Sequence, residues 1–234
     1  MKQQPTFSVL WVIITILVGG VVSGLVALMV VVSDQVPDQP VSEMPAAVDT
    51  GDWETFTSDE FNVSLRYPSD WEVNVHSPDL EGDQSVRFIV PAINVVPADT
   101  VGSTPFDHFA DRPNVSIYPY GIPTEGVSGE QEPSAVPFAE ETVRAVDYVL
   151  ADGSPWATYA VFAHPPESWE AWGFVWARTT VNGLVVECFA DGRLVSDNEC
   201  DPLSGHQLIR AGTVSAEERA IVEVILESVR FRNR

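Results

Sequence analysis

An uncharged apolar run near the start of the chain constrains the fold most strongly. It extends from Phe7 to Val32, and its only hydroxyl side chains are Ser8, Thr15 and Ser23. At a helix rise of about 1.5 Å per residue, such a run can cross a hydrocarbon core of about 30 Å. The apolar region of a cleavable signal peptide is shorter, roughly 7–15 residues. The sequence therefore predicts an uncleaved transmembrane signal anchor over residues 7–32.

The charges on either side of this run predict its orientation. Lys2 precedes the run, whereas the first basic residue after it is Arg66. Because positive charge favours the cytoplasmic side, we expect residues 1–6 in the cytoplasm and the C-terminal domain outside it. The predicted localisation is the cell membrane, with a single pass. Gly20 and Gly24 form a GxxxG step, which is compatible with a weak homodimer through this helix.

The residues after the run divide into a linker and one domain. Residues 33–52 contain Pro37, Pro40 and Pro45 and several acidic residues, but no basic one. Prolines keep such a segment extended, and like charges keep it solvated. Residues 53–234 remain, and they are enough for a single domain of common size.

The net charge of the chain excludes one class of partner, and its two cysteines predict one covalent bond. The chain has 12 Lys and Arg against 34 Asp and Glu, a formal net charge of −22. Such a surface repels phosphate backbones, so we expect no nucleic-acid partner. Cys188 and Cys200 are the only cysteines. In an exported chain such a pair predicts a disulfide, although two free thiols are the alternative.

The first half of the domain shows the alternation of half-buried strands. Phe61–Tyr67 alternates apolar and polar residues, and Trp71–His76 resumes the same period after a break at Pro68. Further strands are predicted around Val86–Val90 and Val115–Ile117, with a short helix over 105–110.

Two hairpins are predicted in the second half. Residues 143–150 could form a helix, but their Val and Tyr content and the Asp152-Gly153 turn before Trp156–Phe162 favour a hairpin. The second hairpin joins Phe174–Val181 to Leu184–Phe189 through Asn182-Gly183, because Asn-Gly between β-rich runs is typical of a tight turn.

A helix and a closing strand are predicted at the end of the chain. Ser215 and Glu218 have the spacing of a capping box, and an apolar stripe runs from Ile221 to Leu226. Val229 and Phe231 then alternate as a strand. These elements predict an α+β domain, an antiparallel sheet flanked by helices.

Both ends of the domain resemble the PsbP-like family. The opening carries Tyr67-Pro68 followed by Trp71, and the closing helix and strand carry Ile225-Leu226 and Val229 to Phe231. The resemblance spans about residues 53–234 in order, with specific matches only at the two ends. It implies an α-β-α sandwich around an antiparallel sheet. Many bacterial relatives are exported proteins, and the resemblance carries over no site residue and implies no photosynthetic role.

No sequence pattern indicates a catalytic site, so we predict no enzyme, cofactor or metal. There is no nucleophile elbow, phosphate-binding loop or zinc-protease motif. The four histidines do not share the spacing of a metal site: His76, His108, His164 and His206. Acidic side chains near the cysteines favour a solvated acidic loop, with a Ca²⁺ site as the alternative. They are Asp191, Asp197, Glu199 and Asp201.

Closely spaced tryptophans supply the candidate interaction patch. They are Trp156, Trp169, Trp172 and Trp176. The sequence favours a core role for them, since a mid-sheet strand usually faces the core, and an aromatic patch for a sugar or peptide partner is the alternative. The predicted function is a non-enzymatic, membrane-anchored module that binds a protein or a component of the cell envelope. The alternatives are a hydrolase with a site assembled from scattered residues, and a cation-dependent adhesion or sensing domain.

Overall fold

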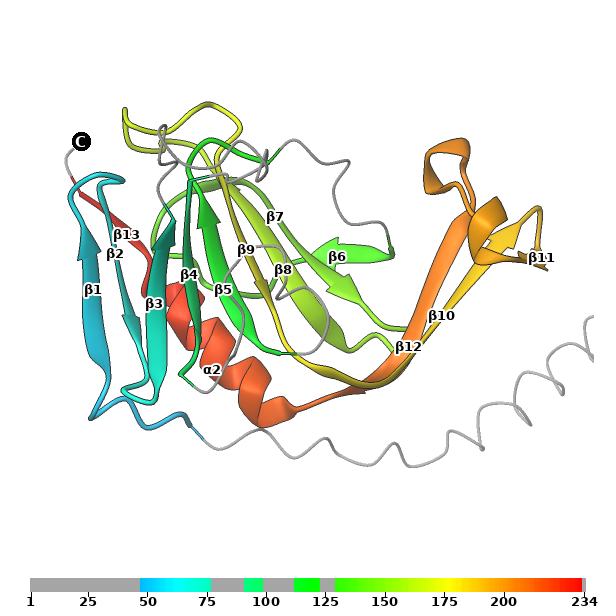
Figure 1. Cartoon of the computed structure of the whole chain (residues 1–234), viewed down its shortest axis with the longest axis horizontal. Helices are drawn as coiled ribbons and strands as arrows, with labels where there is room; N and C mark the ends of the chain where they lie inside the picture. The colour runs from blue at the N-terminus through cyan, green and yellow to red at the C-terminus, as the bar shows by residue number, and fades with distance from the viewer. Residues whose placement is uncertain (1–46, 77–90, 99–111, 123–128, 233–234) are drawn as a thin grey trace, which may run out of the picture. The chain divides into compact units, whose positions relative to one another are not determined.

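The computed structural model describes residues 47–76, 91–98, 112–122 and 129–232 (Figure 1). They belong to one compact unit, Pro45–Arg234. Three antiparallel sheets and one α-helix account for most of these residues.

The largest sheet has seven strands in the order β3-β4-β5-β9-β8-β7-β6. Two antiparallel meanders build it, and they meet where β5 pairs with β9, Ser116 opposite Trp176. The strand bounds are β3 Trp71–His76, β4 Ala92–Pro97, β5 Asn114–Tyr118, β6 Gln131–Pro133, β7 Thr142–Val149, β8 Pro155–Phe162 and β9 Phe174–Arg178. The predicted strands at Trp71–His76 and Val115–Ile117 and the hairpin around Asp152-Gly153 are confirmed.

A small sheet brings the two ends of the domain together. Strand β2 (Val63–Tyr67) lies between β1 (Glu54–Ser58) and β13 (Arg230–Phe231). Phe231 pairs with Val63, so the predicted closing strand is confirmed. Phe61, Val63 and Leu65 point into the core, as their alternation predicts.

Helix α2 (Ala216–Glu227) covers one face of the seven-stranded sheet (Figure 1). The Ser215 side chain accepts a hydrogen bond from the Glu218 backbone N–H, 3.3 Å away, which satisfies an open donor of the first turn. The carboxylate of Glu218 does not complete a capping box. It accepts instead from the backbone N–H of Thr180 at 3.1 Å, and so ties the helix start to the end of β9.

The two faces of the large sheet belong to different core clusters. On the helix face, Val222, Ile225 and Leu226 pack against aliphatic side chains of β4, β5 and β9, such as Val95 and Val115. On the opposite face an aromatic cluster gathers. Its buried members are Ala92, Tyr118, Tyr148, Leu150, Trp156, Ala157, Phe174 and Trp176.

The third sheet, which we call the arm, projects beyond the seven-stranded sheet (Figure 1). Its central strand β10 (Val181–Ala190) pairs with β11 (Arg193–Val195) and with β12 (Gln207–Val214). Two short 3₁₀ helices, η2 (Asp197–Glu199) and η3 (Pro202–Ser204), lie between β11 and β12. The arm therefore leaves the large sheet after β9 and returns to the domain at the start of α2.

The predicted hairpin between Phe174–Val181 and Leu184–Phe189 is wrong. Strand β9 pairs with β5 and β8, whereas Asn182 and Gly183 lie inside β10. The register of β10 against β12 shifts between Asn182 and Val185, and Gly183 has φ +63°. The backbone freedom of this glycine thus serves a β-bulge instead of a tight turn.

The predicted fold class is also wrong. The described residues are mainly β, with one α-helix on one face of the large sheet, so they do not form an α-β-α sandwich flanked by helices. The strand predicted at Val86–Val90 and the helix at 105–110 lie outside the described residues.

The predicted membrane anchor is not supported either. Residues 7–32, with Gly20 and Gly24, lie outside the described residues. In the part of the chain that the structure describes, no helix is long and apolar enough to cross a membrane. The single-pass membrane localisation and the membrane partner predicted from the sequence therefore gain no support from the structure.

Candidate interaction surfaces

The structure does not bring the four predicted patch tryptophans together on the surface. Trp156, Trp169 and Trp176 are buried, and only Trp172 is exposed, with 64% of its surface accessible. Trp169 belongs to the helix-side core, where its indole N–H donates to the Phe61 carbonyl at 2.8 Å. Core packing, which the sequence favours, holds for three of the four.

Trp172 is held in a defined position although it is exposed. Its indole N–H donates to the carbonyl of Tyr120 at 2.7 Å. A Cβ atom at Gly121 would collide with Cδ1 of the ring, so the indole packs directly on the glycine backbone. The contact fixes the ring against the turn that follows β5.

Several large apolar side chains of the arm are exposed. Leu184, Val185 and Val186 are consecutive in β10, and all three are exposed. Because successive residues of a strand point to opposite faces, both faces of the arm present apolar groups. Leu194 in β11 and Leu203 in η3 are exposed as well, at 63% and 76%. Runs of exposed apolar residues are unfavourable in water unless a partner covers them.

A disulfide closes the far part of the arm. Cys188 in β10 is bonded to Cys200, with the two Cα atoms 5.9 Å apart, so the predicted bridge is confirmed. Hydrogen bonds add order there. Asp201 caps η3 by accepting from the Leu203 N–H at 3.0 Å, and His206 Nδ1 accepts from the Asp201 N–H at 3.0 Å.

The acidic residues near the cysteines act as local caps. The Ser196 hydroxyl donates to Glu199 at 2.9 Å, and the Ser204 hydroxyl donates to Asp201. These hydrogen bonds, more than any other cause, lower the pKa of Glu199 and of Asp201. Within the described ranges, no three His, Cys, Asp or Glu side chains are placed to hold a metal ion.

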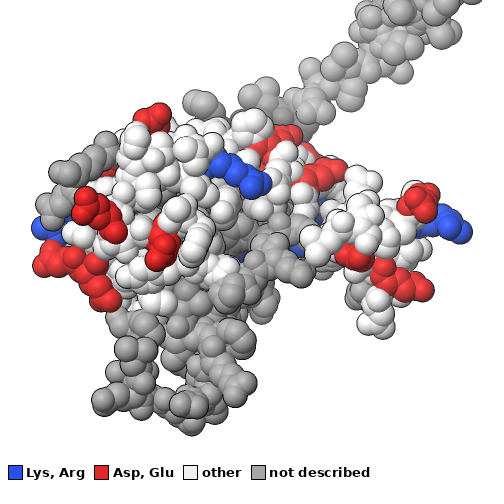
Figure 2. Space-filling view, turned by 90° about the horizontal axis from the view of Figure 1, so that it is seen from above, with Lys and Arg blue, Asp and Glu red and all other residues white. Residues whose placement is uncertain are grey.

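The charged side chains on the arm are mainly acidic (Figure 2). Exposed carboxylates are spread from β10 to η3, and Arg193 is the exposed basic residue among them. The carboxylates are those of Glu187, Asp191, Glu199 and Asp201. The arm therefore combines apolar side chains with negative charge.

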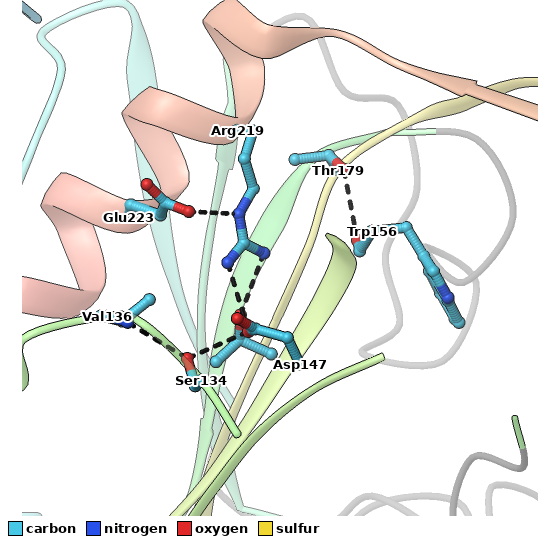
Figure 3. Close-up of polar contacts among 8 residues, drawn as sticks. Ser134, Val136, Asp147, Trp156, Thr179, Arg219 and Glu223 are labelled. Atoms are coloured by element: carbon cyan, nitrogen blue, oxygen red, sulfur yellow. Dashed lines mark hydrogen bonds and ion pairs between the residues drawn. The ribbon is translucent and has the colours of Figure 1, made fainter. Parts of the chain in front are cut away.

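A buried ionic cluster joins helix α2 to the large sheet (Figure 3). Arg219 donates to Asp147 of β7 at 3.2 Å, to Thr158 of β8 at 3.0 Å and to Glu223 at 2.6 Å. Asp147 also accepts from the hydroxyls of Thr158 and Ser134, at 2.5 and 3.0 Å. Arg219 and Asp147 each have several partners and are shielded from water, so the cluster is suited to holding the helix in place.

The face of the large sheet opposite α2 is aromatic and polar, and we call it the polar face. Trp176 lies edge-on to Tyr148 and Trp156, with ring centroids 5.4 and 6.2 Å apart. The Arg210 guanidinium of the arm lies 5.3 Å from the Trp156 ring centre. The central strands add buried polar side chains, which the sequence analysis missed. They are Asn94, Asn114, Ser116 and Arg178.

The described histidines are spread over different parts of the domain. His164 is exposed, 3.7 Å from Glu141, and His206 belongs to the arm. His76 ends β3, and His108 lies outside the described residues.

In comparisons with known proteins, no family model, curated protein or solved structure matches this chain. The resemblance to PsbP-like domains stays a prediction.

Proposed function

We propose that this chain is a non-enzymatic binding module whose arm docks into an apolar groove of a basic protein partner. The observation that carries the proposal is the exposed run Leu184-Val185-Val186, which presents apolar groups on both faces of a projecting strand. Strand β10 has ten residues and is roughly 33 Å long, and only its first residue, Val181, packs against the aromatic core cluster.

Charge specifies the partner further. The arm carries several exposed carboxylates beside its apolar residues, and the chain has a net charge of −22. A second copy of the same chain would be repelled, whereas Lys and Arg side chains at the rim of a groove would be attracted. The disulfide supports this role, because it reduces the entropy lost when the end of the arm is ordered on binding.

Site-specific crosslinking tests the proposal in the cells that make the protein. A photoreactive side chain replaces Leu194 in the full chain. In the matched control it replaces Val143, which is 68% exposed on β7 of the large sheet. We expect a protein adduct at position 194 and none at position 143. The adduct is identified by mass spectrometry, and the partner is then purified.

Binding of the purified partner decides the outcome. Leu194→Asp should weaken the affinity at least about tenfold, Val143→Asp should leave it unchanged, and added salt should weaken it for both the wild type and Val143→Asp. Equal crosslinking at the two positions, an adduct with a second copy of the chain, or full affinity of Leu194→Asp would each refute the proposal.

A further inference from the structure

Polar side chains occupy the middle of the polar face, where a two-sided core would carry aliphatic ones. Strands β4, β5 and β9 are the central strands of the sheet order, and helix α2 covers their other face. Asn94 is 2% exposed, Ser116 4% and Arg178 5%. Burying a polar group is unfavourable unless it has hydrogen-bond partners, so these residues need an explanation.

Asn94 and Ser116 lie in one cross-strand row with Trp176. Asn94 is directly opposite Ser116, and Ser116 is directly opposite Trp176. Directly paired residues point to the same face, and neighbouring strands are about 4.8 Å apart. The Asn94 amide and the Trp176 indole therefore flank the Ser116 hydroxyl within roughly 10 Å, the size of a small organic molecule.

Two members of the row have hydrogen-bonding capacity that the protein does not use. Both side-chain atoms of the Asn94 amide and Nε1 of Trp176 are buried and have no hydrogen-bond partner among the described residues. Native proteins leave few such groups, and each one needs an explanation. A ligand that accepts from the indole and from the amide would satisfy both.

The charge of the polar face favours an anionic ligand. Strands β4, β5 and β9 contain no acidic residue, although the chain as a whole is strongly acidic. Arg178 brings a positive charge to this face. Burial raises the pKa of the neighbouring Tyr118, and a hydrogen bond with Ser116 and the charge of Arg178 oppose that rise, so the Arg178 charge acts on the Tyr118 hydroxyl.

The rings supply an apolar surface beside the donors. Tyr118 and Phe174 lie with ring centroids 5.0 Å apart, and Phe174 is also 5.0 Å from Tyr159. An aromatic or other flat apolar body packs well against such rings. A carboxylate fits the donors because it only accepts hydrogen bonds.

We propose that the polar face binds a small carboxylic acid with a flat apolar body. The carboxylate accepts from the Trp176 indole and the Asn94 amide, and the Ser116 hydroxyl, which donates to Asn114 Oδ1 at 3.4 Å, turns to donate to it instead. The apolar body packs on Tyr118 and Phe174. This site is independent of the arm.

Benzoate is the probe, and benzamide is its neutral counterpart of the same shape. Both are titrated into the full chain while tryptophan fluorescence and the thermal midpoint are followed. We expect saturable quenching and a rising midpoint with benzoate and neither with benzamide. Leu194→Asp, on the arm, should bind benzoate like the wild type.

Asn94→Leu separates a binding role from a structural one. Without benzoate this variant should be more stable than the wild type, because an amide without partners is replaced by an apolar group of similar size. Its affinity for benzoate should fall at least about tenfold. Ser116→Ala should also weaken benzoate binding, whereas Ser64→Ala, the same change in strand β2, should not.

Two results would overturn the proposal. One is an equal response, or none, to benzoate and benzamide in the wild type. The other is an Asn94→Leu protein that is less stable than the wild type yet keeps its affinity, which would make Asn94 a purely structural residue.

Discussion

Arg219 Nη2 lies 3.2 Å from Asp147 Oδ1, and both side chains are less than a tenth exposed. Removing one member of a buried ion pair leaves the other charge without compensation, which typically costs about 3–5 kcal/mol. We therefore expect Arg219→Ala to lower the free energy of unfolding by about 3 kcal/mol, measured by urea denaturation.

Glu223 provides the matched control for this prediction. It contacts the same guanidinium at 2.6 Å, but its side chain is 38% exposed. Glu223→Ala should cost less than about 1 kcal/mol, because a solvated ion pair contributes little. The double variant Arg219→Met with Asp147→Leu should be more stable than Arg219→Ala. Equal costs for Arg219→Ala and Glu223→Ala would show that the buried pair contributes no more than the exposed one.

Loss of the disulfide should loosen the arm and spare the large sheet. For a loop with a sequence separation of 12, chain entropy assigns the bridge about 3 kcal/mol. In Cys188→Ser with Cys200→Ser, amide hydrogen exchange should accelerate in β11, η2 and η3. Exchange in β5 and β9 should stay at the wild-type rate. Acceleration throughout the sheet would mean that the arm and the sheet unfold as one unit.

Gly121→Ala should destabilise the protein more than Gly153→Ala. Both glycines have positive φ, +67° and +84°, so each substitution carries a similar backbone strain of about 1 kcal/mol. Only at Gly121 would the new Cβ collide with Trp172, since nothing lies within 4 Å of a Cβ at Gly153. We expect an additional cost of about 1 kcal/mol at Gly121 and a shift in tryptophan emission. Equal costs would show that the indole moves aside freely.

Alkaline pH should destabilise the fold through its buried tyrosines. Burial is the largest cause that raises the pKa of Tyr118, Tyr148 and Tyr159 above the usual 10.0. Because the pKa of these tyrosines is higher in the folded than in the unfolded state, their neutral form contributes to stability. This contribution is complete below pH 10 and is lost as the pH rises through the pKa of the folded state. Ultraviolet absorbance should show these tyrosines ionising above pH 10. In Tyr118→Phe, the free energy of unfolding should fall less steeply as the pH rises. Ionisation of all tyrosines near pH 10 without unfolding would contradict this expectation.

Local patterns in the sequence predicted the local elements. The alternation of Trp71–His76, the cap at Ser215 and the pair Cys188 and Cys200 each depend on nearby residues, and the structure confirms them. The Asn182-Gly183 turn failed because long-range pairing of β10 with β12 outweighed the local preference for a tight turn. The α-β-α class failed because it rested on matches at the two ends, which do not determine what covers the second face of the sheet.

The candidate sites depend on placement that no local pattern encodes. Leu184-Val185-Val186 has the composition of a buried strand, and only the departure of β10 from the large sheet makes it exposed. Asn94 and Trp176 are far apart in the chain, and the order β4-β5-β9 places them in one row. The one available hint was the polar position of Asn94 within an otherwise apolar run, Ala92–Pro97.

The pairing of β5 with β9 has a consequence for the order in which the molecule can be made. The strands β3, β4 and β5 come from the first half of the chain, and β9 is the last strand of the second meander to leave the ribosome. Until β9 arrives, β5 presents the open edge of an apolar strand, Asn114–Tyr118, to other chains. The nascent protein is thus exposed to wrong pairing from the synthesis of Tyr118 until that of β9, and a fragment that ends before Phe174 should aggregate instead of folding.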